Sequence, residues 1–280
     1  FTFLPTTAFS VFVLPNDYNK RYDDSTKLFG FLNTPLQISA QTDSQQLYVF
    51  QAHQKVEKKK ASTAANNKNV KKGVSALKYM KSIEGNEQDL LTDLTLTFET
   101  PVQFNDSFPI ILCDTLNKPL PNYTVAIDTA TKKVVTIHYD WIESTPMRLI
   151  IPKRSLLDSN QNYIAKADTI KFITKSDAAY GSALVRVSGY QNMGHPILLL
   201  TKENKLAFSY PIKQSLIQML KLPPGDYDLK VLDDTNNNGI WDTGKYNNSI
   251  KQQPEIVKKL TDILNIKANW ENEVNVIINK

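Results

Sequence analysis

The feature that most constrains the fold is an alternation of apolar and polar residues with a period of two. Residues 94–98 read Leu-Thr-Leu-Thr-Phe, and similar patterns recur at 134–139, 184–187 and 227–231. Residues 197–200 form a short continuous apolar run, which also indicates a strand. Because alternate side chains of a strand point to opposite faces, the pattern predicts β-strands along most of the chain.

Turn signals separate these stretches. Asn117-Lys118-Pro119, Asp158-Ser159-Asn160 and Pro223-Pro224-Gly225 combine residues that preset or tolerate turn geometry. Short strands at a spacing of roughly 8–12 residues predict β-sandwiches. Helical periodicity is weak, and we expect at most a turn or two of helix at 215–221 and 255–264. The predicted fold class is all-β.

Two segments of the chain resemble each other. Residues 4–14 align without gaps on residues 222–232, since both begin with Leu-Pro, place an aromatic residue at a strand start and end in Val-Leu. With one residue omitted, residues 21–23 then align with residues 240–242. The alignment predicts two related β modules, of which the first is truncated at its N-terminus. Chance similarity between strand-like residues is the alternative.

The positive charge is concentrated in one stretch. The formal net charge is +5, but residues 53–81 contain nine lysines and one acid, so the remaining chain sums to −3. Residues 53–76 are rich in Lys, Ala and Asn, which predicts a flexible linker. Binding to anionic lipid, lipopolysaccharide or nucleic acid is the alternative. Because this stretch lacks interleaved aromatic residues, we predict no nucleic-acid partner.

Several motifs together resemble one bacterial family. Gln88-Asp89-Leu90-Leu91, followed by the alternating residues 94–98, is similar to the opening of a bacterial Ig-like domain, and residues 168–175 resemble its last strand. Residues 222–227 and 234–244 are similar to a C-terminal module of the Ig-like-domain-containing surface lipoproteins of Bacteroidota. Further matches to this module lie at 252–255 and 267–270.

The resemblance covers almost the whole chain and implies four parts. They are the C-terminal part of a prealbumin-like β module (1–52), a Lys-rich linker (53–76), an Ig-like β-sandwich (77–176) and a C-terminal prealbumin-like β-sandwich (177–280). It also implies an outer-membrane location facing the cell exterior, a lipid anchor outside this chain, and other surface lipoproteins as partners. The chain opens on Phe1 without a signal peptide, so we expect a fragment of a longer precursor.

One loop carries a candidate calcium site. Its residues are Asp234, Asn236, Asn238, Gly239 and Asp242 at positions 1, 3, 5, 6 and 9 of a calcium-loop pattern, with the Ile240 carbonyl at position 7. Alternating side chains converge on a hard cation, and glycine permits the sharp turn. Lys245 stands at position 12, where an acid is expected, so the predicted affinity is weak. The alternative is a turn whose polar side chains cap their own backbone. In the first copy, residues 16–20 lack the glycine and the alternation, and we expect no metal there.

Trp241 and Trp270 lie beside polar residues and are candidates for stacking on a sugar or a partner. We favour the alternative that both cover the edge of the C-terminal core, because large aromatic residues anchor cores more often than they bind carbohydrate.

Catalytic motifs are absent from the sequence. It contains neither a Gly-x-Ser-x-Gly elbow, nor a P-loop, nor His-Glu-x-x-His, and Asp140 and Glu143 beside Trp141 are the nearest acid pair. The single cysteine, Cys113, excludes an intramolecular disulfide and is expected to be buried and inert, and His138 is expected on a sheet face. We therefore predict a non-catalytic structural or interaction subunit of an outer-membrane assembly. A glycan-binding accessory protein is the alternative.

Overall fold

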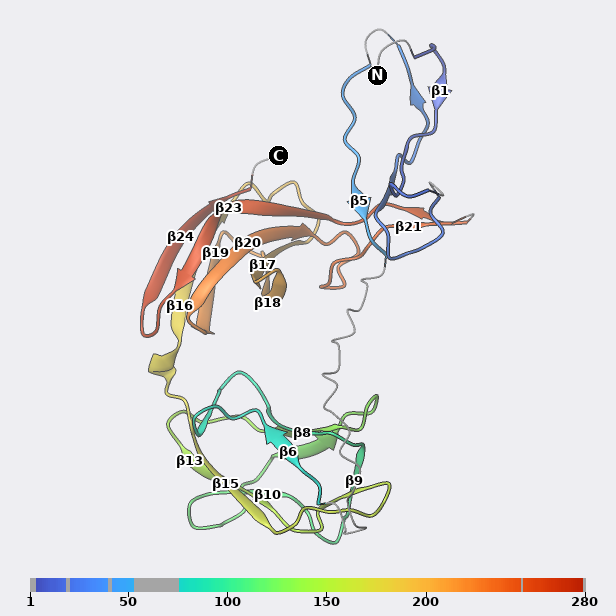
Figure 1. The fold of residues 1–280 in the computed structure, drawn as a ribbon. Coiled ribbons are helices and arrows are strands. Elements are labelled where there is room, and N and C mark those ends of the chain that lie inside the picture. Colours follow the sequence, from blue (N-terminus) through green and yellow to red (C-terminus); the bar gives the residue numbers. More distant parts are fainter. Residues whose placement is uncertain (1–3, 19–20, 40–41, 53–75, 248, 279–280) are drawn as a thin grey trace.

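The structure is a computed structural model that describes residues 4–18, 21–39, 42–52, 76–247 and 249–278. Its regular elements are β-strands and one 3-10 turn, η1 (Asp177–Ala179), so the chain is all-β as predicted. The strands form three groups (Figure 1). Within the described residues, no helix is long and apolar enough to span a membrane.

The middle group is a β-sandwich. Its strands are β6 (Tyr79–Lys81), β7 (Glu87–Gln88), β8 (Leu94–Phe98), β9 (Val102–Phe104), β10 (Ile111–Cys113), β11 (Thr124–Ile127), β12 (Val134–His138), β13 (Pro146–Ile151), β14 (Leu156–Asp158) and β15 (Asp168–Thr174). One sheet has the order β11-β12-β8-β6 and the other β10-β13-β15-β7, while β14 pairs with β9. All these pairs are antiparallel except β15 with β7.

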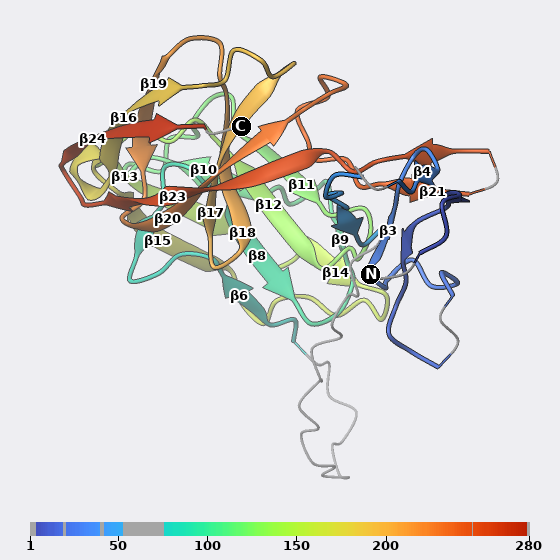
Figure 2. The same cartoon turned by 90° about the horizontal axis from the view of Figure 1, so that it is seen from above.

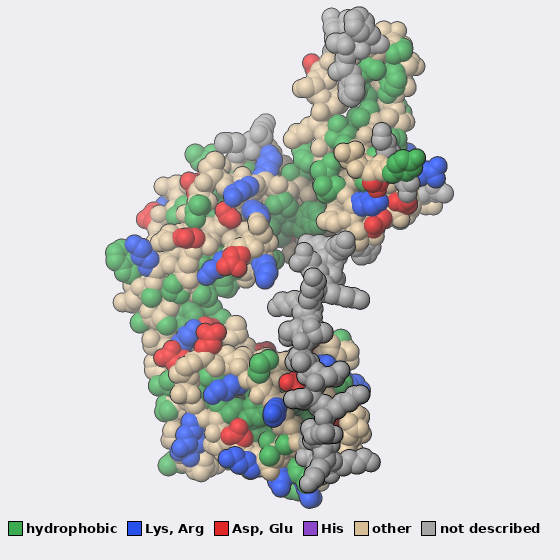
Figure 3. Space-filling model, viewed as in Figure 1, with side chains coloured by type: hydrophobic (Ala, Val, Ile, Leu, Met, Phe, Trp, Pro, Cys, Tyr) green, Lys and Arg blue, Asp and Glu red, His purple; other side chains and the backbone are tan. Residues whose placement is uncertain are grey.

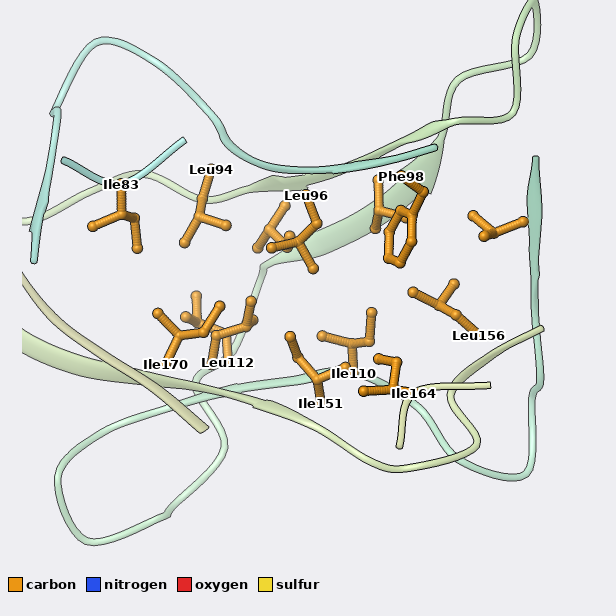
Figure 4. Close-up of a cluster of buried hydrophobic side chains, with 14 of the residues drawn as sticks. Ile83, Leu94, Leu96, Phe98, Ile110, Leu112, Ile151, Leu156, Ile164 and Ile170 are labelled. Carbon is orange, nitrogen blue, oxygen red and sulfur yellow. The ribbon is translucent and has the colours of Figure 1, made fainter. Parts of the chain in front are cut away.

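Alternation in β8 builds the core of this sandwich. Leu94, Leu96 and Phe98 are at most 2% exposed and point toward the opposite sheet, where Leu112 and Ile151 are fully buried (Figure 4). The predicted period of two is therefore confirmed for this strand. Burying side chains of this size stabilises a fold by about 1.5–3 kcal/mol each, relative to leaving them exposed.

The C-terminal group is a second sandwich. Its strands are β16 (Gly181–Ser188), β17 (Pro196–Lys202), β18 (Lys205–Pro211), β19 (Leu216–Leu222), β20 (Gly225–Asp233), β23 (Ile256–Ile266) and β24 (Glu271–Ile277). One sheet has the order β18-β17-β20-β23 and the other β19-β16-β24, with β24 parallel to β16. The continuous apolar run at 197–200 is the centre of β17, and each of its four residues is at most 9% exposed, so this strand is buried on both faces.

The two helical turns expected from the sequence are wrong. Residues 215–221 lie almost entirely in β19, and residues 255–264 lie almost entirely in β23. Both strands are rich in β-branched and large apolar residues, and their burial alternates along much of their length. These residues pack well on a pleated surface, and pairing with neighbouring strands overrides a weak helical period.

The N-terminal group is a small hairpin assembly. It contains β1 (Ala8–Phe9), β2 (Phe12–Val13), β3 (Phe29–Phe31), β4 (Leu36–Gln37) and β5 (Val49–Phe50). β1 pairs with β4, and β2, β3 and β5 form a three-stranded sheet in that order. This group lies beside a two-stranded hairpin, β21 (Lys245–Tyr246) and β22 (Lys251–Gln252), which projects from the loop between β20 and β23 (Figure 2).

The repeated segments share one pairing register. Phe9 pairs with Leu36 as Tyr227 pairs with Leu264, and Phe12 pairs with Phe31 as Lys230 pairs with Lys259. Matched residues of the first strand in each copy (β1 and β2 against β20) are 218 apart in residue number. Matched residues of the strand that pairs with it (β4 and β3 against β23) are 228 apart. A register shift between Phe9 and Phe12 matches the bulge between Asp228 and Lys230. The connecting loop is therefore ten residues longer in the second copy, where it carries β21 and β22.

The copies differ in how their first strand is covered. Strand β20 has β17 on one side and β23 on the other, whereas in the described residues β1 pairs only with β4 and β2 only with β3. Val13 and Leu14 are 36% and 43% exposed, while the matched Val231 and Leu232 are fully buried. The same residue types are thus core in one copy and surface in the other.

Candidate functional site

The loop after β20 is closed by its own carboxylates. Asp234 is buried, and its Oδ2 accepts a hydrogen bond from the Gly239 N–H at 2.7 Å while its Oδ1 accepts one from Asn238 N–H at 3.2 Å. Asp242 Oδ2 accepts from the side-chain amides of Asn236 and Asn238 at 2.5 and 2.6 Å. Five of the predicted positions therefore belong to one hydrogen-bonded network.

The environment of Asp234 favours its charged form. Burial alone raises the pKa of this carboxyl, but hydrogen bonds from the backbone N–H groups of Gly239, Asn238 and Asn237 outweigh burial, and the pKa is lowered. A lowered folded-state pKa means that the carboxylate stabilises the fold above its unfolded pKa. This stabilisation is lost as pH falls through the lower, folded value.

Glu255 organises the same loop and was missed by the sequence analysis. It is 6% exposed; its Oε1 accepts from the Thr235 N–H at 2.7 Å and its Oε2 accepts from the Asp242 N–H at 2.9 Å. The Glu255 carbonyl also accepts from the Trp241 indole N–H at 3.0 Å. No local spacing marks Glu255, because it lies 13 residues beyond Asp242 and reaches the loop only when β23 pairs with β20.

The geometry is compatible with both interpretations of the loop. In the described residues, no three His, Cys, Asp or Glu side chains form a metal-binding group. A calcium ion would therefore depend on the amide oxygens of Asn236 and Asn238 and on the Ile240 carbonyl, together with Asp234 and Asp242. The hydrogen bonds observed are those of a self-capping turn. Lys245 begins β21 and supplies no acid at position 12.

Calcium binding remains a prediction, and heat denaturation tests it. With a Kd of about 10⁻⁴–10⁻³ M, about 10 mM CaCl₂ is expected to raise the Tm by about 3–10 °C by mass action. MgCl₂ should have no comparable effect, and Asp242→Asn should abolish the shift, while Asp262→Asn on the exposed face of β23 should keep it. A Tm that is indifferent to calcium leaves the self-capping turn as the whole role of the loop.

The β21–β22 hairpin completes the core of the N-terminal group. The Tyr246 ring lies 4.8 Å from the Phe31 ring and 5.2 Å from the Phe29 ring, and Phe29, Phe31 and Phe50 are each at most 2% exposed. Gly244 lies so close to Phe50 that a Cβ there would come within 2.4 Å of the ring. Hydrophobic side chains gather where the two groups meet (Figure 3).

Hydrogen bonds reinforce this junction. The Gln253 side-chain amide donates to the Phe31 carbonyl at 2.8 Å and to Asn33 Oδ1 at 3.1 Å, and the Thr243 hydroxyl donates to the Gln51 carbonyl at 3.3 Å. Aromatic packing across more than 200 residues of sequence leaves no local signal, so the sequence analysis missed it. The longer loop of the second copy thus fastens the first copy to the second sandwich.

The two tryptophans lie in different surroundings. Trp241 is 42% exposed with its indole N–H fixed by the Glu255 carbonyl, and Trp270 is 61% exposed with the Lys267 ammonium 5.2 Å from its ring centre. Neither belongs to the buried clusters of the second sandwich. The favoured role of both residues in covering the edge of the C-terminal core, and the alternative of stacking on a sugar or a partner, therefore both stay predictions.

The other chemically reactive residues have structural partners. Glu143 Oε2 accepts from the Asp177 N–H at 2.7 Å, at the start of η1. Cys113 is fully buried, and burial raises the pKa of its thiol, in line with the expected inert role. His138 is exposed at the end of β12, and its Nδ1 lies 2.8 Å from Asp93 Oδ1. Asp140 is exposed.

Comparisons with known proteins do not place the chain in a family. No family model and no curated protein matches it. Among solved structures it is similar to native alpha-2-macroglobulin from Escherichia coli, spanning domains MG0-NIE-MG1, at 12% identity and a TM-score of 0.29, over 66% of this chain and 70% of that one. It is also similar to the Bacillus anthracis TIE protein at 9% identity and a TM-score of 0.21, over 74% of this chain and 42% of that one. TM-scores this low identify neither a family nor a function.

Proposed function

We propose that this protein is a non-catalytic interaction subunit of an assembly at the bacterial outer membrane. It docks other surface proteins through the edge of its N-terminal hairpin. The outer-membrane location, the lipid anchor outside this chain and the lipoprotein partners are supported by the resemblance in sequence motifs alone. The docking role is supported by one observation on the fold: within the described residues, β1 and β2 each pair with another strand on one side only.

The edge formed by β1 and β2 is suited to accept a strand. The Val11 carbonyl accepts from the Leu32 N–H, so Val11 faces β3 and the backbone groups of Phe12 and Leu14 point to the opposite side. In the second copy, the Asp234 N–H donates to the His195 carbonyl beside β17. The matched edge of β20 is therefore the one that pairs with β17.

Apolar side chains accompany this edge. Leu4, Phe12, Val13 and Leu14 are each 36–43% exposed. A strand edge with unpaired backbone groups and exposed apolar residues is a ready template for pairing with another chain. A partner strand here would bury the apolar side chains and satisfy the backbone groups together.

Affinity capture tests the proposed docking role. The tagged chain, incubated with a mild-detergent extract of the source organism's outer membranes, should retain one or more envelope proteins at near-stoichiometric amounts. Leu14→Lys should abolish this, because a lysine at an edge opposes strand pairing. Leu116→Lys is the matched control, since Leu116 is 85% exposed in a turn of the middle sandwich. A chain recovered alone, or a partner retained by Leu14→Lys, contradicts the proposal.

A further inference from the structure

A cleft in the N-terminal group combines polar side chains without any charge. It has a volume of about 360 Å³ and lies between the turn that joins β3 to β4, the chain leading into β5, and Gln253 of the second copy. Its lining includes the amide side chains of Asn33, Gln37, Gln45, Gln46 and Gln253, together with Tyr48. None of its lining residues is acidic or basic, so a charged ligand would lose hydration without gaining a counter-charge.

An unsatisfied acceptor borders this cleft. The Gln253 amide nitrogen already donates to the Phe31 carbonyl and to Asn33 Oδ1. Its Oε1 is buried and accepts no hydrogen bond from the described residues. A buried amide oxygen without a donor is unfavourable, so a hydroxyl that displaced the atoms covering Oε1 would gain a hydrogen bond there.

The side chains fit the chemistry of sugars. Each amide offers both donors and acceptors, which matches hydroxyl groups that donate and accept at once. Tyr48 is 36% exposed and, with Pro35 and Leu36, supplies an apolar surface for the C–H face of a sugar ring. The volume is at the lower end of the ~300–1,000 Å³ range of ligand pockets.

We propose that this cleft binds a neutral oligosaccharide. Its lining contains neither a residue of β1 or β2 nor Trp241 or Trp270, so it adds a glycan-binding activity to the docking role. Because Gln253 comes from the second copy, the cleft is complete only when the β21–β22 hairpin holds the two groups together. Glycan binding therefore requires the intact junction.

Calorimetry with defined sugars tests the cleft. The probes are maltohexaose, cellohexaose, xylohexaose and mannohexaose, with hexagalacturonate as the charged comparison, each titrated into the full chain. At least one neutral hexasaccharide should bind with a Kd on the order of 1 mM or tighter. The double variant Gln46→Ala/Tyr48→Ala should weaken that binding about tenfold, since it removes an amide and an aromatic surface.

Controls separate the cleft from other surfaces. Gln218→Ala, at an exposed amide of β19, and Trp270→Ala should leave the Kd unchanged, and an unchanged Tm should show that the double variant is folded. The proposal is overturned if no neutral hexasaccharide binds at about 10 mM. It is equally overturned if the double variant binds as well as the parent chain, if Trp270→Ala removes binding, or if hexagalacturonate binds as tightly as the neutral sugars. None of these outcomes bears on capture through Leu14.

Discussion

Replacing Gly244 by alanine is expected to release the N-terminal hairpin from the second sandwich. The added Cβ would lie 2.4–2.6 Å from three atoms of the Phe50 ring. That ring is 2% exposed and packs edge-on against Phe29 and Phe31, with ring centres 5.9 and 6.3 Å away, so it cannot turn aside freely. Overpacking of this kind typically costs about 1–3 kcal/mol.

Limited proteolysis measures the release. Cleavage after Lys27, which pairs with Asp17 in the folded hairpin, should become about 5- to 150-fold faster, since proteolysis follows the population of the open state. Cleavage within the second sandwich should keep its rate. Gly194→Ala is the matched control, because the nearest atom to its Cβ is 3.8 Å away. Equal cleavage of Gly244→Ala and the parent chain would mean that the hairpin is not fastened at this point.

The strands were predictable because their signals are local. The sequence pattern at 94–98 coincides with β8, and the apolar run at 197–200 lies inside β17. A period of two is a property of neighbouring residues and survives in almost any sheet. β19 and β23 were misread because a few apolar residues also fit a helical spacing, and only their partners in the sheets decide between the two.

The sites were less predictable because they join distant residues. The alternation of Asp and Asn at 234–242 predicted the loop, but the match at 252–255 assigned the buried Glu255 no part in it. Tyr246 reaches Phe31 across more than 200 residues, and the amide cleft needs Gln253 beside Asn33. Such contacts form only when the loop of the second copy, which is ten residues longer, packs against the first copy. A periodic sequence pattern reports on neighbouring residues and cannot predict contacts between such distant segments.

The edge of β1 and β2 in the first copy is expected to have a large effect on the exchange of its backbone amides with water. In the chain alone, the amides of Phe12 and Leu14 point away from β3, while their counterparts Lys230 and Leu232 face β17. A backbone N–H at an uncovered edge exchanges with water after small local openings. A ladder N–H in a core strand exchanges only after opening on the scale of the whole module.

Amide hydrogen exchange, read residue by residue on the isolated chain, tests this account most directly. The amides of Phe12 and Leu14 should exchange about 100-fold faster, or more, than those of Lys230 and Leu232. The captured partner should then slow exchange at Phe12 and Leu14 and leave the second copy unchanged. Equal protection of the two copies in the isolated chain would mean that the first strand is already covered, and the edge could not be the docking surface.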